Sequence, residues 1–152
     1  MKASFTFVFV LIAGFSAYSQ TLGEFKLPKT WEKDFTVSLA NHGSMSAGAT
    51  DLRFTYDSCI YTVSSKNKAK RKVYLLKELD RVSILRKLQE LKVDEIRPKS
   101  TYATVNDGWS ESLCFSINCI EGGTSVELTD SDRISFSGAY RFLEEFAIKK
   151  TR

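Results

Sequence analysis

The sequence predicts an α+β domain in which an antiparallel sheet of four to five strands is covered on one face by two helices. Several short segments alternate apolar and polar residues, as half-buried strands do. An apolar repeat of helical spacing spans residues 77–95, and a second one ends the chain. These patterns follow the order strand, two strands, helix, two strands, helix. Such an order favours an antiparallel sheet with both helices on the same side.

The first 19 residues have the pattern of a cleavable signal peptide. Met1 and Lys2 give a positive start, and the uncharged apolar run FTFVFVLIAGF follows. This run is shorter than the roughly 20 residues that a membrane-spanning helix needs. Ala17 and Ser19 place small residues three and one before Gln20, as signal peptidase requires. We therefore expect the mature chain to begin at Gln20 and to act in the periplasm or outside the cell, without a membrane anchor.

The mature chain is expected to contain one domain. Residues 20–34 form an arm without periodicity, in which Leu27 or Trp31 is expected to contact the core, and residues 35–152 suffice for a single core. The net charge is +4 and becomes +3 when Lys2 leaves with the signal peptide. Nucleic-acid-binding domains are usually strongly basic on one face, whereas here acidic and basic residues are interspersed. We expect no nucleic-acid partner.

Three strands are predicted in the first half of the domain. Residues 35–40 alternate in the manner of a half-buried strand, and residues 52–56 do so again. Between them, residues 41–50 (NHGSMSAGAT) hold small residues and predict a loop. A turn near residues 57–58 is expected to lead into a third strand at residues 60–63, which are rich in β-formers.

The middle of the chain predicts a charged segment followed by a helix. Residues 66–72 (KNKAKRK) carry five positive charges in seven residues, which is typical of a solvated hairpin tip or sheet edge. Residues 77–95 predict an amphipathic helix that ends before Pro98. Its apolar positions are Leu79, Val82, Leu85, Leu88 and Leu91, with Ile84 beside them.

The second half predicts a hairpin and a terminal helix. After a connection at residues 98–111, the alternation over residues 112–120 predicts one continuous strand. A turn at residues 121–123 and a returning strand at residues 126–128 are expected to follow. Residues 133–136 read as a short extended piece before the last helix, for which Ser137 is the expected N-cap. The predicted core side of the first strand holds Leu113, Phe115, Ile117 and Cys119.

The three cysteines can form one disulfide at most, and export would allow it. In one continuous strand, the Cα atoms of Cys114 and Cys119 would lie about 16 Å apart. A disulfide joins Cα atoms within about 7 Å. A bridge would therefore join Cys59 to one of the other two, and Cys119 is favoured because it shares the expected core side. Three unpaired thiols are the alternative.

No motif predicts catalysis, a metal site or a cofactor. Ser44 follows His42 by two residues, but no G-x-S-x-G pattern surrounds this serine. With His42 as the only histidine, the cysteines lack a zinc-binding pattern. Asp130 and Asp132 lack the glycine and the closing glutamate of a calcium loop. We expect the protein to be no enzyme and to bind neither metal nor cofactor.

Two segments are the candidate recognition sites. The loop residues His42, Gly43, Ser44 and Met45 belong to a segment with too few apolar groups to build a core. Trp109 belongs to the 98–111 connection, and exposed aromatic residues on loops often anchor a partner. The alternative is that Trp109 packs over the sheet edge.

Residues 35–150 resemble small domains of the emfourin type, which inhibit metalloproteases, and exported bacterial domains of unknown function. The similar segments are NHGSMSAG after the first strand, the helix LDRVSILRKLQEL and the strand DGWSESLCFSI. The sequence differs from the family where Gly43 is followed by Ser44 instead of a second glycine. The resemblance implies an exported module that binds a protein, with inhibition of an exported protease as the most specific expectation. An envelope structural protein and an enzyme without a recognised motif are the alternatives, and the oligomeric state stays open.

Overall fold

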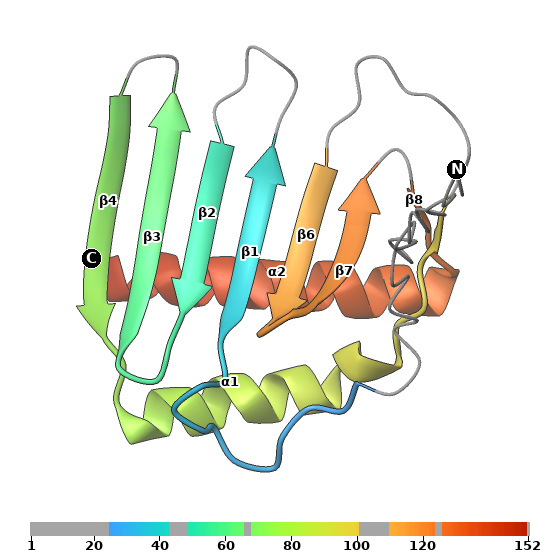
Figure 1. Ribbon diagram of the computed structural model, residues 1–152, viewed down its shortest axis with the longest axis horizontal. Helices are drawn as coiled ribbons and strands as arrows, with labels where there is room; N and C mark the ends of the chain where they lie inside the picture. Colours follow the sequence, from blue (N-terminus) through green and yellow to red (C-terminus); the bar gives the residue numbers. More distant parts are fainter. Residues whose placement is uncertain (1–24, 43–48, 66–67, 101–109, 124–125, 152) are drawn as a thin grey trace, which may run out of the picture.

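Six strands form one antiparallel sheet in the order β4-β3-β2-β1-β6-β7 (Figure 1). The computed structural model describes residues 25–42, 49–65, 68–100, 110–123 and 126–151. Its elements are β1 (Val37–His42), β2 (Ala49–Phe54), β3 (Ser58–Ser65), β4 (Lys68–Leu75), α1 (Glu78–Glu90), the 3-10 turn η1 (Val93–Glu95), β5 (Lys99–Ser100), β6 (Ser110–Phe115), β7 (Asn118–Gly123), β8 (Val126–Glu127) and α2 (Asp130–Thr151). The predicted α+β class is confirmed, with six strands in the main sheet.

The centre of the sheet joins segments that are far apart in the sequence. β1 pairs with β2 on one side and with β6 on the other, so that Val37 lies opposite both Phe54 and Phe115. β5 and β8 form a separate two-stranded sheet beyond β7. The charged segment predicted as a hairpin tip or sheet edge includes most of β4, the outermost strand.

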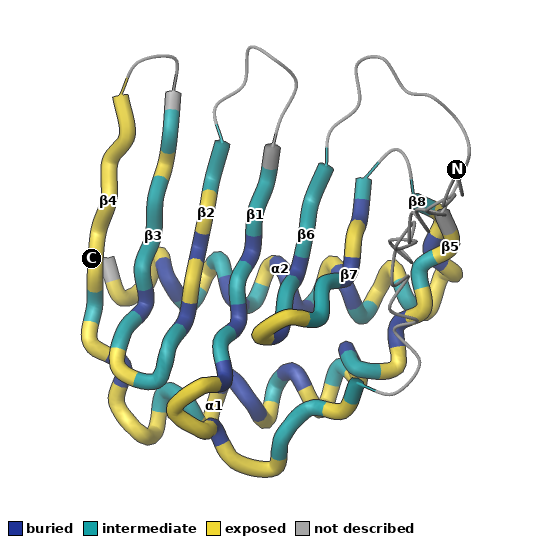
Figure 2. The backbone as a smooth tube through the Cα atoms, in the orientation of Figure 1, coloured by how far each residue is buried: buried dark blue, intermediate teal, exposed yellow. Residues whose placement is uncertain are grey.

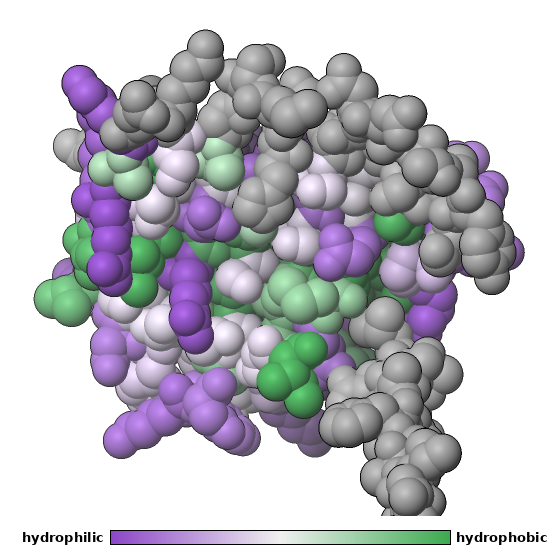
Figure 3. Space-filling view, turned by 45° about the horizontal axis from the view of Figure 1, so that its top comes forward, coloured by the Kyte–Doolittle hydropathy of each residue, from purple (hydrophilic) through white to green (hydrophobic). Residues whose placement is uncertain are grey.

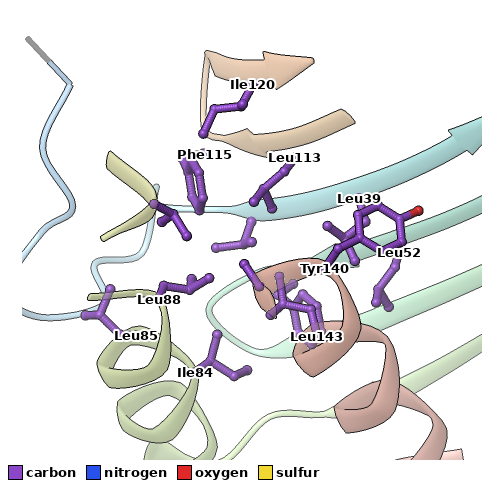
Figure 4. Packing of buried hydrophobic residues seen from close by; sticks show 14 of the residues in the cluster. Leu39, Leu52, Ile84, Leu85, Leu88, Leu113, Phe115, Ile120, Tyr140 and Leu143 are labelled. Atoms are coloured by element: carbon purple, nitrogen blue, oxygen red, sulfur yellow. The ribbon is translucent and has the colours of Figure 1, made fainter. Parts of the chain in front are cut away.

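Both helices pack on the same face of the sheet, as predicted. α2 crosses behind the strands, and α1 lies near the end of the sheet where the β2–β3 and β6–β7 turns are found (Figures 1 and 2). Alternate strand residues point toward the helices and are buried. Figure 4 shows this layer, in which side chains of the strands meet those of both helices: Leu39, Leu52, Leu113, Phe115 and Ile120 from the sheet, Ile84, Leu85 and Leu88 from α1, and Tyr140 and Leu143 from α2.

The N-terminal arm contacts the core through both residues predicted for this role, with Trp31 buried in the core and Leu27 packed against it. The Trp31 side chain is buried, and its indole Nε1 donates a hydrogen bond to the Phe35 carbonyl oxygen at 2.9 Å. Phe25 stacks on Phe115 with ring centroids 5.5 Å apart. The backbone amide of Leu27 donates to the Asp94 carboxylate at 3.2 Å, which ties the arm to η1.

Residues 112–120 form a hairpin, so the prediction of one continuous strand is wrong. β6 ends at Phe115, and the chain reverses at Ser116 and Ile117 before β7 begins. Ser116 has a φ of 54°, a left-handed conformation uncommon for a residue with a side chain. Ile117 is 79% exposed at the turn, although its apolar side chain predicted a core position. Residues 121–123 belong to β7 and are no turn.

The hairpin also corrects the predicted disulfide. Cys114 and Cys119 are register partners across β6 and β7, and they form a disulfide with Cα atoms 4.0 Å apart. Cys59 is a free, buried thiol. The predicted Cys59–Cys119 pair is therefore wrong, because the distance argument assumed an extended chain between residues 114 and 119.

The helix boundaries differ from the predictions in two places. α2 begins at Asp130, so residues 133–136 are helical and not extended. Thr129 Oγ1 accepts a hydrogen bond from the Asp132 amide at 3.2 Å, which is the geometry of an N-cap. The predicted N-cap, Ser137, lies inside α2 and donates to the Arg133 carbonyl oxygen at 2.7 Å. In α1, Leu79 and Val82 are exposed, because the helix packs through Ile84, Leu85 and Leu88.

Candidate functional site

The sheet has one face that neither helix covers, and we call it the uncovered face (Figure 1). The residues that alternate with the buried ones point to this side of the sheet. A shallow hollow of about 480 Å³ lies over β1, β2, β3 and β6. The outward side chains that line it are Ser38, Ala40, Asp51, Arg53, Ile60, Thr62, Arg71, Ser112 and Cys114.

Small side chains line the middle of the uncovered face. Ala40 of β1 lies opposite Ser112 of β6, and Ser38 lies beside them on β1. Charged side chains flank this centre, with Asp51 and Arg53 on β2. Figure 3 shows pale and apolar residues in the middle of this face, with strongly hydrophilic ones beside them and toward the rim. A second surface could therefore approach the strands closely in the centre and meet charges around it.

Apolar side chains are exposed where the uncovered face reaches β4. Val73 is 56% exposed and Leu75 is 81% exposed. Val73 lies opposite Ile60 in the register of β3 and β4, and Ile60 is half-buried. Contiguous exposed apolar side chains of this kind often mark a contact surface.

The disulfide lies on the side of the uncovered face away from β4, where it joins β6 to β7. Cys114 and Cys119 are both half-buried and tie β6 to β7. The remaining cysteine, Cys59, faces the core, and burial raises the pKa of its thiol to about 12. A thiol with so high a pKa is protonated at neutral pH and is a poor nucleophile.

The predicted recognition residues attach to one end of the sheet. His42 is the last residue of β1, and its register partners are Ala49 and Ser110. Gly43, Ser44 and Met45 lie outside the described residues. Trp109 lies outside them as well, immediately before Ser110 in the chain. The strands thus place the attachment points of the two predicted segments side by side, although the sequence separates them by more than 60 residues.

A polar cluster lies on the helix-covered side at the same end of the sheet. Asn41 Nδ2 donates to the Glu111 carboxylate at 3.4 Å. Burial and the charge of Glu144 raise the pKa of Glu111 above that of an ordinary glutamate. Burial, together with the negative charges of Glu111 and Glu144, also raises the pKa of Tyr140. Sequence reasoning missed this cluster because its members come from β1, β6 and α2, and no local spacing relates them.

The cluster supplies a carboxyl group that binds a proton more tightly than usual and a phenol that stays protonated. Neither the Tyr140 phenol nor the Asn41 amide can activate a nucleophile at neutral pH. Among the described residues, no group of three or more histidine, cysteine, aspartate or glutamate side chains is placed to hold a metal ion. This arrangement alone does not assign a reaction.

A pocket of about 370 Å³ lies between the N-terminal arm, α1 and the turn that follows β2. Arg81 is one of the residues that line this pocket. Its guanidinium lies 4.0 Å from the centroid of the Tyr56 ring, and Nη1 donates to the carbonyl oxygens of Tyr56 at 2.7 Å and Leu76 at 3.2 Å. Arg81 therefore joins α1 to the turn between β2 and β3. These contacts stabilise the fold and engage the guanidinium within the protein.

A search of protein-family models and of curated protein sequences finds no match to this chain. Neither described helix is long and apolar enough to cross a membrane.

Proposed function

We propose that this chain is an exported, non-enzymatic module that binds a protein through the uncovered face. The observation that carries the proposal is the hollow of about 480 Å³ in the middle of a face that the described helices leave open. The solvated face of an antiparallel sheet usually carries polar side chains. Here the short side chains of Ser38, Ala40 and Ser112 leave the hollow in the centre of the face. At the β4 side, Val73 and Leu75 expose apolar surface.

Two observations support export. The first 19 residues have the charge, length and small-residue pattern of a signal peptide. The Cys114–Cys119 disulfide is the kind of bond that persists in oxidising compartments and is rare in the cytoplasm. The two observations are independent, because one concerns the leader and the other the folded domain.

Binding fits the described side chains better than catalysis does. A nucleophilic enzyme needs a nucleophile beside a base. The free thiol, Cys59, is fully buried with a raised pKa, and Glu111 is hydrogen-bonded to an amide. An envelope structural role would require no central hollow. The resemblance to emfourin-type domains makes an exported metalloprotease the first partner class to test.

The test uses a double substitution that fills the hollow, Ala40→Arg with Ser112→Arg. The mature protein, residues 20–152, is titrated against a panel of exported metalloproteases. The expected result is a stoichiometric loss of activity of one of them, which the double variant abolishes. The matched control, Ser83→Arg with Ser131→Arg, adds the same charge at exposed helix positions and should inhibit like the wild type.

Binding that the panel does not detect is tested by cross-linking in the native exported fraction. The cross-linked residues of this chain should lie on the uncovered face, and the filled variant should lose the adduct. A complex that forms equally well with the filled variant would show that the uncovered face is not the contact surface.

A further inference from the structure

We propose that the free edge of β4 accepts an extended acidic segment of the partner as a seventh strand. This inference deepens the proposed function and rests on it, because it states the chemistry of the partner. β4 is the terminal strand and pairs with β3 at all eight of its positions, from Lys68 opposite Ser65 to Leu75 opposite Ser58. Among the described elements, none pairs with its outer edge.

The two edges of the sheet differ in a way that singles out β4. The opposite edge, β7, contacts β8 of the small two-stranded sheet, although the two strands are not paired. The outer edge of β4 offers unpaired backbone amides and carbonyls over eight residues that contain no proline. Seven of these eight residues are exposed, with Tyr74 half-buried (Figure 2). An added strand could satisfy these groups by ordinary sheet hydrogen bonds.

The charge of β4 selects an acidic strand. Lys68, Lys70, Arg71 and Lys72 belong to no ion pair between described residues. Their register partners on β3 are all uncharged, namely Ser65, Val63, Thr62 and Tyr61. Opposite charges directly across two strands stabilise their pairing, and like charges destabilise it. The same lysines therefore oppose pairing with a second copy of β4 and favour pairing with aspartate or glutamate.

The apolar residues at the end of β4 indicate which way the added acidic strand would run. Residues 73–75 (VYL) follow the basic half, and Val73 and Leu75 are exposed. The complementary segment therefore carries acidic residues opposite positions 68–72 and apolar residues opposite positions 73–75. In the antiparallel arrangement of this sheet, such a segment reads apolar and then acidic from its N-terminus. A nucleic acid would match the charges but neither the apolar half nor the backbone edge.

The β4 edge adjoins the uncovered face. Arg71 lines the central hollow, and Val73 lies on the same side of β4. A partner seated on the uncovered face can therefore continue onto the β4 edge without a break. The β4 edge supplies backbone pairing, and the hollow supplies close contact.

The test uses a fluorescein-labelled peptide with the sequence Val-Thr-Val-Glu-Glu-Glu-Thr-Glu and measures binding by fluorescence anisotropy. We expect the triple variant Lys70→Glu, Arg71→Glu, Lys72→Glu to bind the peptide at least about ten-fold more weakly, because three attractive pairs become repulsive. The control variant Lys33→Glu, Lys99→Glu, Arg133→Glu makes the same change of net charge at exposed positions elsewhere. It should bind within about two-fold of the wild type, since distant charges are screened. Thermal melts verify that both variants are folded.

Two further probes separate strand addition from attraction by charge. Two versions of the peptide are N-methylated on alternate sets of amides, and only one set faces β4 in an added strand. One version should lose binding and the other should keep it. Equal binding of both versions, equal weakening by both protein variants, or absence of binding would overturn the proposal. Binding of an oligothymidine of equal charge at the same edge, with equal affinity, would also overturn it. These outcomes are independent of the variant that fills the hollow, so failure here is distinguishable from failure of the proposed function.

Discussion

Cys59 and the disulfide pair illustrate how position decides the chemistry of identical side chains. Cys59 is fully buried, and its pKa is raised to about 12, while Cys114 and Cys119 are bonded to each other. We therefore expect no thiol of the native protein to react with Ellman's reagent at pH 8. One thiol should react in denaturant, and three should react after reduction. A rapidly reacting native thiol, or a non-reduced peptide map that links Cys59 to Cys119, would contradict the disulfide pairing.

Asp80 joins the two helices, and its titration should appear in the stability of the fold. Its carboxylate accepts the Lys77 amide at 2.9 Å and lies 2.8 Å from Lys150 Nζ of α2. Burial disfavours the charged form, but the contacts with Lys150 and with the Lys77 amide outweigh this effect and lower the pKa of Asp80. A carboxyl group whose pKa is lower in the folded state stabilises the fold above its unfolded pKa. That stabilisation is lost as the pH falls through the folded pKa.

We expect Asp80→Asn to lower the free energy of unfolding by about 0.5–1 kcal/mol at pH 7, as for a partly exposed ion pair. The difference from the wild type should shrink as the pH falls below 4. The measurement is urea unfolding across this pH range. Glu95→Gln serves as the control, because the Lys92–Glu95 pair is longer at 3.9 Å and more exposed. A difference that persists unchanged at low pH would show that the charge of Asp80 is not its source.

At the scale of elements, Gly122 sets how closely the β6–β7 hairpin packs on α2. A Cβ atom at this position would lie 2.7 Å from Cε1 of Phe136, whose ring is buried. Gly122→Ala should therefore shift the ring or the hairpin and destabilise the fold by about 1–3 kcal/mol. Adding Phe136→Leu, which shortens the opposing side chain, should recover part of this loss in thermal unfolding.

A second glycine provides the control for this contact. At Gly138 in α2, a Cβ atom would lie 3.2 Å from Cδ2 of Leu91, a half-buried side chain that can rotate. Alanine is also favoured over glycine in a helix by about 1 kcal/mol. Gly138→Ala should be neutral or stabilising. If both alanine variants lost equal stability, the close approach of Gly122 to Phe136 would not be the cause.

At the scale of the whole molecule, the arm that follows the predicted leader is part of the core. Phe25 stacks on Phe115, and the Trp31 side chain is buried. We therefore expect cleavage before Gln20 to leave the fold unchanged, so that the full chain and residues 20–152 unfold at the same urea concentration. Intact-mass measurement of the native exported protein should give a chain that begins at Gln20. Recovery of an exported species that retains residues 1–19 would contradict the signal-peptide prediction.

Local patterns in the sequence were sufficient for the class of the fold. The alternation over residues 35–40 and 52–56 predicted β1 and β2, and the helical repeat after residue 77 predicted α1. The basic segment predicted a solvated hairpin tip or sheet edge, and most of it lies in β4, the edge strand. These predictions succeed because the period of a strand or a helix is a property of consecutive residues, and burial of one side selects residue types at that period.

Tertiary structure decided what depends on neighbours that are distant in sequence. The hairpin turn at Ser116 and Ile117 carries neither asparagine nor glycine, so no local signal marked it, and the disulfide pairing followed from that turn. Leu79 and Val82 are exposed because only part of the apolar surface of α1 faces the sheet. The uncovered face depends on the pairing of β1 with β6, some 70 residues apart in the sequence. Local periodicity specifies that a strand exists, whereas packing of the assembled layers specifies which strands become neighbours and which face stays open.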